Sequence, residues 1–123
     1  MSGMVIWQRA EGAVIFLAGI WVCNALGLQM AWWWLMALFF APDLAFAAYL
    51  AGPRIGAVAY NVVHNYGFGL VLLMLGSVSG NTMLIALGAL WFGHSGFDRM
   101  LGYGLKSQSG FTETHLGRIG RLR

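Results

Sequence analysis

The chain has 123 residues, of which 59% are hydrophobic and only 9% charged, whereas soluble domains carry about a quarter charged residues. So few charges cannot cover a water-soluble surface of this size, which excludes a soluble globular domain. The net charge of +3 does not indicate nucleic-acid binding, because the basic residues lie at the ends of apolar segments, as membrane topology requires.

Four apolar segments predict an all-α, polytopic membrane protein with four transmembrane helices. Each is close to the ~20 residues that cross a hydrocarbon core of about 30 Å. The spans cover about residues 7–26, 30–50, 55–77 and 82–101, and together they form one transmembrane domain over residues 1–104. The single cysteine, Cys23, cannot form an internal disulfide, and we expect it to pack as a small apolar residue.

Individual residues predict features of the first three segments. Glu11 near the start of the first segment argues against a cleaved signal peptide. Three consecutive tryptophans at 32–34 open the second segment and suit an interfacial aromatic belt. Pro42 removes a backbone hydrogen bond and predicts a kink beside Asp43. The Gly-Pro-Arg sequence at 52–54 predicts the turn into the third segment.

Residues 105–123 form a basic cytoplasmic tail in this interpretation. Thr112 could cap a short amphipathic helix that lies on anionic lipid headgroups of the inner leaflet. A disordered basic tail is the alternative. Apolar residues recur every three positions in the tail, with arginines between them: Leu116, Ile119 and Leu122, and Arg118, Arg121 and Arg123.

The basic residues also predict the orientation. They lie before the first span, between the second and third, and after the fourth, whereas the other two connections carry none. The positive-inside rule therefore predicts a multi-pass protein of the cell inner membrane with both termini in the cytoplasm. Four spans, an even number, also require both termini to lie on the same side of the membrane.

The acidic residues are the most informative feature of the chain. There are only four, and Glu11, Asp43 and Asp98 lie in or at the edge of predicted spans. Counted along the helices, these three residues with His64 and His94 lie roughly 5–13 Å from the cytoplasmic ends. Because buried charges in a membrane find partners, we expect one polar cluster in the cytoplasmic half.

We predict that this cluster has functional residues of three kinds. The candidate catalytic residues are Glu11, Asp43, His64, His94 and Asp98. The candidate metal ligands, for a divalent ion such as zinc, are His64, His94 and Asp98. The candidate substrate-binding residues or countercharges are Arg54, Asn61 and Arg99.

Three functions stay open for the cluster at this point. Buried ion pairs could simply fix helix packing, as polar residues do between membrane helices. The histidines and carboxylates could form a metal or acid–base site acting on a lipid-borne substrate. A chain of protonatable groups could also couple protons to transport, in which case four short helices would need a homo-oligomer. There is no HExxH, CxxC or aspartate-rich run to decide for a metal.

Two stretches of the chain, APDLAFAAYLAGPRIGAVAYNVVHNY (41–66) and WFGHSGFDRMLGYGLKSQSGFTETHLGRIGR (91–121), resemble the family called domain of unknown function 4260. The resemblance extends over the full length and implies a small bacterial integral membrane protein of about this size and span number. It implies no activity. It also implies that the tail is an integral part of the protein, and we expect the tail to fold back over the cluster and bring Lys106 or His115 near Asp98.

Overall fold

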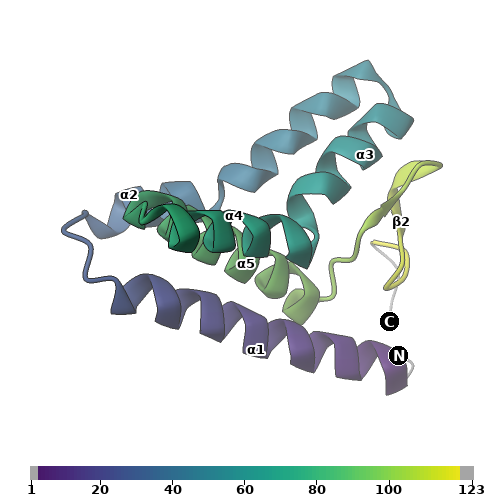
Figure 1. Ribbon diagram of the computed structural model, residues 1–123. Coiled ribbons are helices and arrows are strands. Elements are labelled where there is room, and N and C mark those ends of the chain that lie inside the picture. Colours follow the sequence, from purple (N-terminus) through teal and green to yellow (C-terminus); the bar gives the residue numbers. More distant parts are fainter. Residues whose placement is uncertain (1–2, 120–123) are drawn as a thin grey trace.

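The computed structural model describes residues 3–119 and is mostly helical (Figure 1). Its elements, in chain order, are α1 (Gly3–Ala25), α2 (Trp32–Phe39), the 3₁₀ helix η1 (Ala41–Ala51), α3 (Pro53–His64), α4 (Tyr66–Ser79), α5 (Thr82–Leu101), β1 (Lys106–Ser107) and β2 (Gly110–Thr114).

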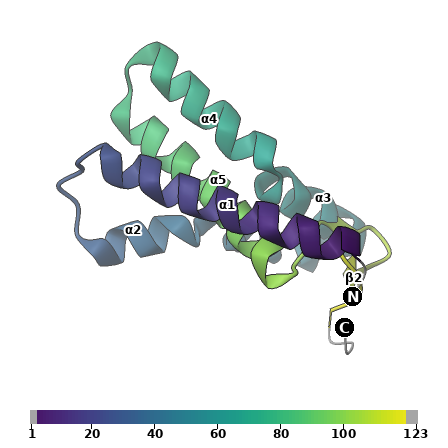
Figure 2. The same ribbon diagram turned by 90° about the horizontal axis from the view of Figure 1, so that it is seen from below.

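Helix α5 lies at the centre of the fold and packs along its length against α1 and α4 (Figures 1 and 2). Glycines allow this close approach. A Cβ atom built on Gly96 would lie 2.6 Å from the carbonyl oxygen of Gly12 across the α1–α5 contact, closer than real side chains come. Small residues of this kind are typical of helix contacts in membranes, where backbones approach closely.

The apolar core lies between α1, α2 and α5. The rings of Phe16, Phe39 and Phe97 contact one another there, with centroids 5.2–5.9 Å apart. Cys23 is buried in the same core and forms no disulfide, which confirms the expectation that it packs as a small apolar residue.

The second predicted span is broken at Pro42, as the sequence indicates. Helix α2 ends at Phe39, and the chain continues as η1. Because proline has no N–H, the carbonyl oxygen of Leu38, four residues earlier, loses its usual partner. The indole nitrogen of Trp91 donates a hydrogen bond to this oxygen at 2.8 Å. A residue of α5 therefore stabilises the break.

The third predicted span is also divided. Helices α3 and α4 meet at Asn65 at an angle of 47°, and the Asn65 side chain satisfies both helix ends. Its amide nitrogen donates to the carbonyl oxygens of Asn61 and Val62, and its oxygen accepts from the N–H of Phe68. As a result, η1 and α3 form an arm that leaves the α1–α4–α5 layer at an angle (Figure 1).

Two helical stretches are long and apolar enough to cross a membrane, Gly3–Ala25 and Trp32–Ala51, and the bent pair α3–α4 would add a third if it forms one span. Large apolar side chains such as Leu50 and Val78 are exposed on the helices. These observations indicate a membrane protein. They give two or three candidate spans within residues 3–119, where the sequence predicts four.

The tail differs from its predicted form. Residues 106–114 form an antiparallel hairpin of β1 and β2, in which Lys106 pairs with Thr114, and no helix follows α5 in the described part of the chain. The predicted short helix capped by Thr112 is therefore wrong over residues 112–119, because the backbone pairs as a hairpin that the Asn61 side chain of α3 holds at Lys106. Arg121, Leu122 and Arg123 lie outside the described residues.

Candidate metal centre

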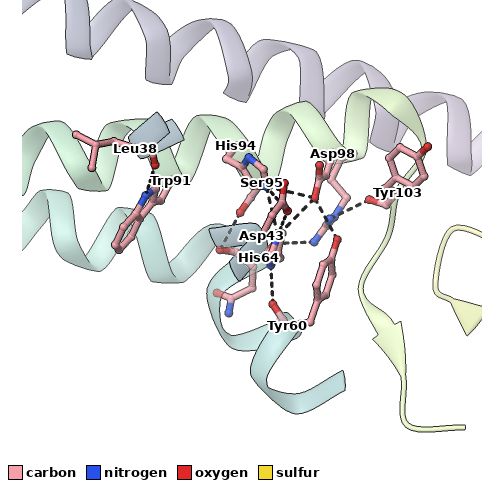
Figure 3. A network of polar contacts seen from close by, with 11 residues as sticks. Leu38, Asp43, Tyr60, His64, Trp91, His94, Ser95, Asp98 and Tyr103 are labelled. Carbon is pink, nitrogen blue, oxygen red and sulfur yellow. Dashed lines mark hydrogen bonds and ion pairs between the residues drawn. The ribbon is translucent and has the colours of Figure 1, made fainter. Parts of the chain in front are cut away.

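Four polar side chains from three separate elements meet at one point (Figure 3). Asp43 comes from the start of η1, His64 from the last turn of α3, and His94 and Asp98 from adjacent turns of α5. One ligand-type atom of each lies within 4.8 Å of all the others. Both histidines are fully buried, whereas the Asp43 side chain is 36% exposed.

The breaks in the helices create this meeting point. Pro42 lies in the first turn of η1, directly after the end of α2 at Phe39, and Asp43 lies in the same turn. The bend at Asn65 makes His64 the last residue of α3, and its backbone carbonyl accepts a hydrogen bond from Arg99 at 2.8 Å. His94 and Asp98 share a face of α5 because they are four residues apart.

The shortest distances join Asp43 to the two histidines. Its Oδ1 lies 3.0 Å from Nε2 of His64 and 3.1 Å from Nε2 of His94, and the two Nε2 atoms lie 3.3 Å apart. The Oδ2 atom of Asp98 is farther away, 3.8 Å from Nε2 of His64 and 3.7 Å from that of His94.

Outer partners orient two members of the cluster. The Nδ1 atom of His64 bonds the carbonyl oxygen of Tyr60 at 2.8 Å, and the Tyr60 ring stacks on the His64 ring at 3.7 Å. The Tyr60 hydroxyl donates to Oδ2 of Asp98 at 3.1 Å. Tyr60 therefore contacts both a histidine and a carboxylate of the cluster. The spacing of four between Tyr60 and His64 is the sequence signal for this role, although the sequence alone does not link Tyr60 to Asp98.

His94 is held differently. Its Nδ1 atom is buried and has no hydrogen-bond partner among the described residues. Its ring makes edge contacts with Phe39 and Phe40, with centroids 5.2 and 5.8 Å away. His94 thus has one side toward the polar cluster and another toward the aromatic core.

The structure brings together four of the eight predicted site residues. Asn61 instead bonds the β-hairpin, and buried Arg99 donates to the carbonyl oxygens of His64 and Tyr103. Glu11 on α1 and Arg54 at the start of α3 are exposed and lie outside the four-residue cluster. The cluster is thus smaller than the sequence predicts, because two of the predicted residues lie on the surface and two others bond backbone groups beside it.

The β-hairpin packs beside the cluster, on the side of α3. Asn61 accepts a hydrogen bond from the backbone N–H of Lys106 at 2.7 Å and donates to its carbonyl oxygen at 2.8 Å. The Lys106 ammonium lies 3.9 Å from the centroid of the Phe111 ring and 5.1 Å from that of Tyr60. Burial lowers the pKa of Lys106, and the Asp98 charge opposes this effect. The hairpin therefore places one cation within electrostatic range of Asp98, as expected for the tail.

His115 has a structural role in the hairpin. Its Nδ1 accepts a hydrogen bond from the N–H of Leu105 at 2.9 Å. The residue is exposed and does not belong to the four-residue cluster.

Residues 5–119 match the family described as Domain of unknown function (DUF4260). The chain belongs to this family. The match covers all four residues of the cluster and the β-hairpin, as the resemblance of the two sequence stretches implies. No curated protein and no solved structure matches the chain.

Proposed function

We propose that this protein is a membrane metalloprotein that binds one divalent ion of the zinc class through Asp43, His64 and His94, with Asp98 as an acid–base group beside it. The convergence of four ligand-type atoms within 4.8 Å carries the proposal. Zinc–nitrogen bonds of about 2.0–2.1 Å give a tetrahedral ligand–ligand distance of roughly 3.3 Å. The separation of the two Nε2 atoms is 3.3 Å, and those to Asp43 are 3.0 and 3.1 Å.

The hydrogen bond of His64 supports a cation at this point. A carbonyl oxygen only accepts, so Nδ1 of His64 carries a proton when it bonds Tyr60. In the neutral ring Nε2 then has a lone pair directed at the Asp43 carboxylate, and two acceptors at 3.0 Å repel each other. A metal ion resolves this conflict. A histidine that donates its other nitrogen to a carbonyl is also the usual arrangement of metal ligands.

The charges of the cluster also favour a bound cation. Within residues 3–119, no arginine or lysine forms an ion pair with Asp43 or Asp98; their only ion-pair contacts are with the two histidines. Buried carboxylates in a membrane are costly unless they are paired or bind a cation. A divalent ion would neutralise both acids at once.

The unequal distances favour a site with an open coordination position. Two histidines and one carboxylate are common ligands of catalytic metals, which keep a further position for water or substrate. A bound ion of this class would supply Lewis acidity and make a water ligand more acidic. Asp98, oriented by the Tyr60 hydroxyl, is then placed to accept a proton. We therefore infer a hydrolytic or other acid–base reaction.

We also propose a membrane topology for this protein. Four spans in the inner membrane, with both termini in the cytoplasm, would place the centre in the cytoplasmic half of the bilayer. The start of α1 lies at the same end of the molecule as β2 (Figures 1 and 2), which supports termini on one side. The tail (residues 105–123), which is basic as a whole, would then face anionic headgroups, and a homo-oligomer is compatible with this arrangement.

The test is elemental analysis of the protein purified in mild detergent without chelators. We expect about one zinc-class ion per chain in the wild type and almost none in His94→Ala. The matched control is His115→Ala, which removes an exposed histidine of the hairpin and should keep the ion. Circular dichroism would verify that each variant retains its helices.

A well-folded wild-type protein that binds no divalent ion, even after addition of Zn²⁺, Mn²⁺ or Co²⁺, would contradict the proposal. The two histidines and two carboxylates would then share protons instead. In that case pH-driven proton flux into liposomes would be the next measurement, because such a cluster could relay protons.

A further inference from the structure

A second feature of the fold lies on the other side of His94. A cavity of about 610 Å³ lies between α1, α2 and α5, within the range of small-molecule sites. Its lining is mainly apolar and aromatic and includes Phe16, Cys23, Leu35, Met36, Phe39 and Phe97. Asn24 and Gln29, at the connection between α1 and α2, are its polar lining residues.

The cavity shares a wall with the metal centre. Phe39 and Phe40 line it and also make the edge contacts with the His94 ring. The Nδ1 atom of His94 is buried without a partner in the described part of the chain. A buried donor or acceptor of this kind costs free energy until a ligand or water satisfies it. The same histidine ring thus has an unpaired nitrogen and contacts two aromatic residues of the cavity lining.

The cavity is also elongated and accessible from the bilayer. Its α1 lining extends from Phe16 to Asn24, about 12 Å along a helix. Met36 and Phe40 line it while remaining 50% and 42% exposed, so that its edge is open at the surface of α2. In a membrane protein this surface faces hydrocarbon.

We propose that this cavity binds the hydrocarbon tail of a membrane lipid, whose polar end is the substrate of the metal centre. This inference rests on the proposed metal site for the reaction, but not for binding of the tail. An apolar, elongated space suits a hydrocarbon chain, and the aromatic wall would place the polar end of the lipid near His94. The substrate class is therefore a lipid, not a water-soluble solute.

The probe is a phosphatidylglycerol with a photoactivatable diazirine in one acyl chain, incorporated into nanodiscs of phosphatidylethanolamine and phosphatidylglycerol. After irradiation, mass spectrometry of peptides would locate the crosslinks. We expect them in residues 16–24 and 35–40. Met36→Trp, which fills the cavity from its open edge, should reduce them at least five-fold. The matched control is Met74→Trp on α4, which is similarly exposed and does not line the cavity.

Two results would overturn the proposal. Crosslinks spread equally over α4 and unaffected by Met36→Trp would mean contact with bulk lipid only. Crosslinks between two copies of the chain through residues 35–40, with no lipid adduct, would mean that a second copy covers the cavity.

Metal content, measured on the same samples, separates this proposal from the preceding one. Loss of lipid crosslinks in Met36→Trp, with about one ion still bound per chain, would support both the metal site and the lipid site. A protein that crosslinks lipid in the cavity but binds no ion would keep the lipid site and reject the metal chemistry.

Discussion

The two faces of α5 differ in their residue types and in the elements that pack against them. The face toward α1 has glycines and aromatic residues, and its backbone approaches that of α1 closely. The face toward η1 and α3 has His94, Ser95 and Asp98, all buried among polar partners. Only the second face depends on breaks in neighbouring helices. Continuous helices thus provide a rigid support, whereas interrupted ones bring the polar groups together.

The largest expected effect comes from the glycine face. In Gly96→Ala the added methyl group would lie 2.6 Å from the backbone of α1, so the helices must separate. Overpacking of this kind costs about 3 kcal/mol. We expect a large decrease in the midpoint of thermal unfolding in detergent, measured by circular dichroism. Gly3→Ala is the control, because no atom lies within 4 Å of the added methyl group; equal destabilisation of both variants would disprove the importance of this contact.

The next largest effect distinguishes the roles of Asp43 and Asp98 in metal binding. Asp43→Asn should weaken binding of Zn²⁺ by more than the ~10–100-fold that is typical of outer partners, because it replaces a ligand. Asp98→Asn should weaken it much less, because Asp98 lies beside the ligands. Isothermal titration calorimetry on the metal-depleted protein measures both. Equal losses would indicate a closed site with four ligands, as expected of a structural metal.

A moderate effect is expected at the break in the second predicted span. Trp91→Phe removes the hydrogen bond to the Leu38 carbonyl. This oxygen still accepts from a backbone N–H at the end of α2, so the loss is that of one hydrogen bond, about 0.5–1.5 kcal/mol. Because the same break positions Asp43, metal binding should weaken together with thermal stability. Trp7→Phe, at an exposed position on α1, should change neither. A Trp91→Phe protein with unchanged metal affinity would show that Asp43 does not depend on this bond.

The smallest effect is expected at the hairpin. Asn61→Ala removes two hydrogen bonds to Lys106, each contributing about 1 kcal/mol. The hairpin should detach while the helices keep their packing. We therefore expect faster trypsin cleavage after Lys106, with little change in the unfolding midpoint. Asn24→Ala, at an exposed position on α1, is the control. Cleavage at the wild-type rate would mean that the hairpin is held by other contacts.

The apolar character of the chain, the family and the four residues of the cluster could be predicted from the amino-acid sequence. Polar groups are rare in segments of this composition, so Asp43, His64, His94 and Asp98 are conspicuous among their apolar neighbours in the chain. Pro42 and the spacing of four between His94 and Asp98 are local signals, and both correspond to features of the structure.

Which of the predicted polar residues lie in contact depends on how the helices pack. Depth along a helix does not give the direction of a side chain, so depth alone places Glu11 in the same half of the membrane as Asp43. The bends at Pro42 and Asn65, stabilised by Trp91 and Arg99 from a distant helix, move η1 and α3 away from the layer. Likewise, the hairpin depends on Asn61, 45 residues before Lys106. Such contacts between segments far apart in the chain leave no local pattern in the sequence, and they fix both the geometry of the polar centre and the cavity beside it.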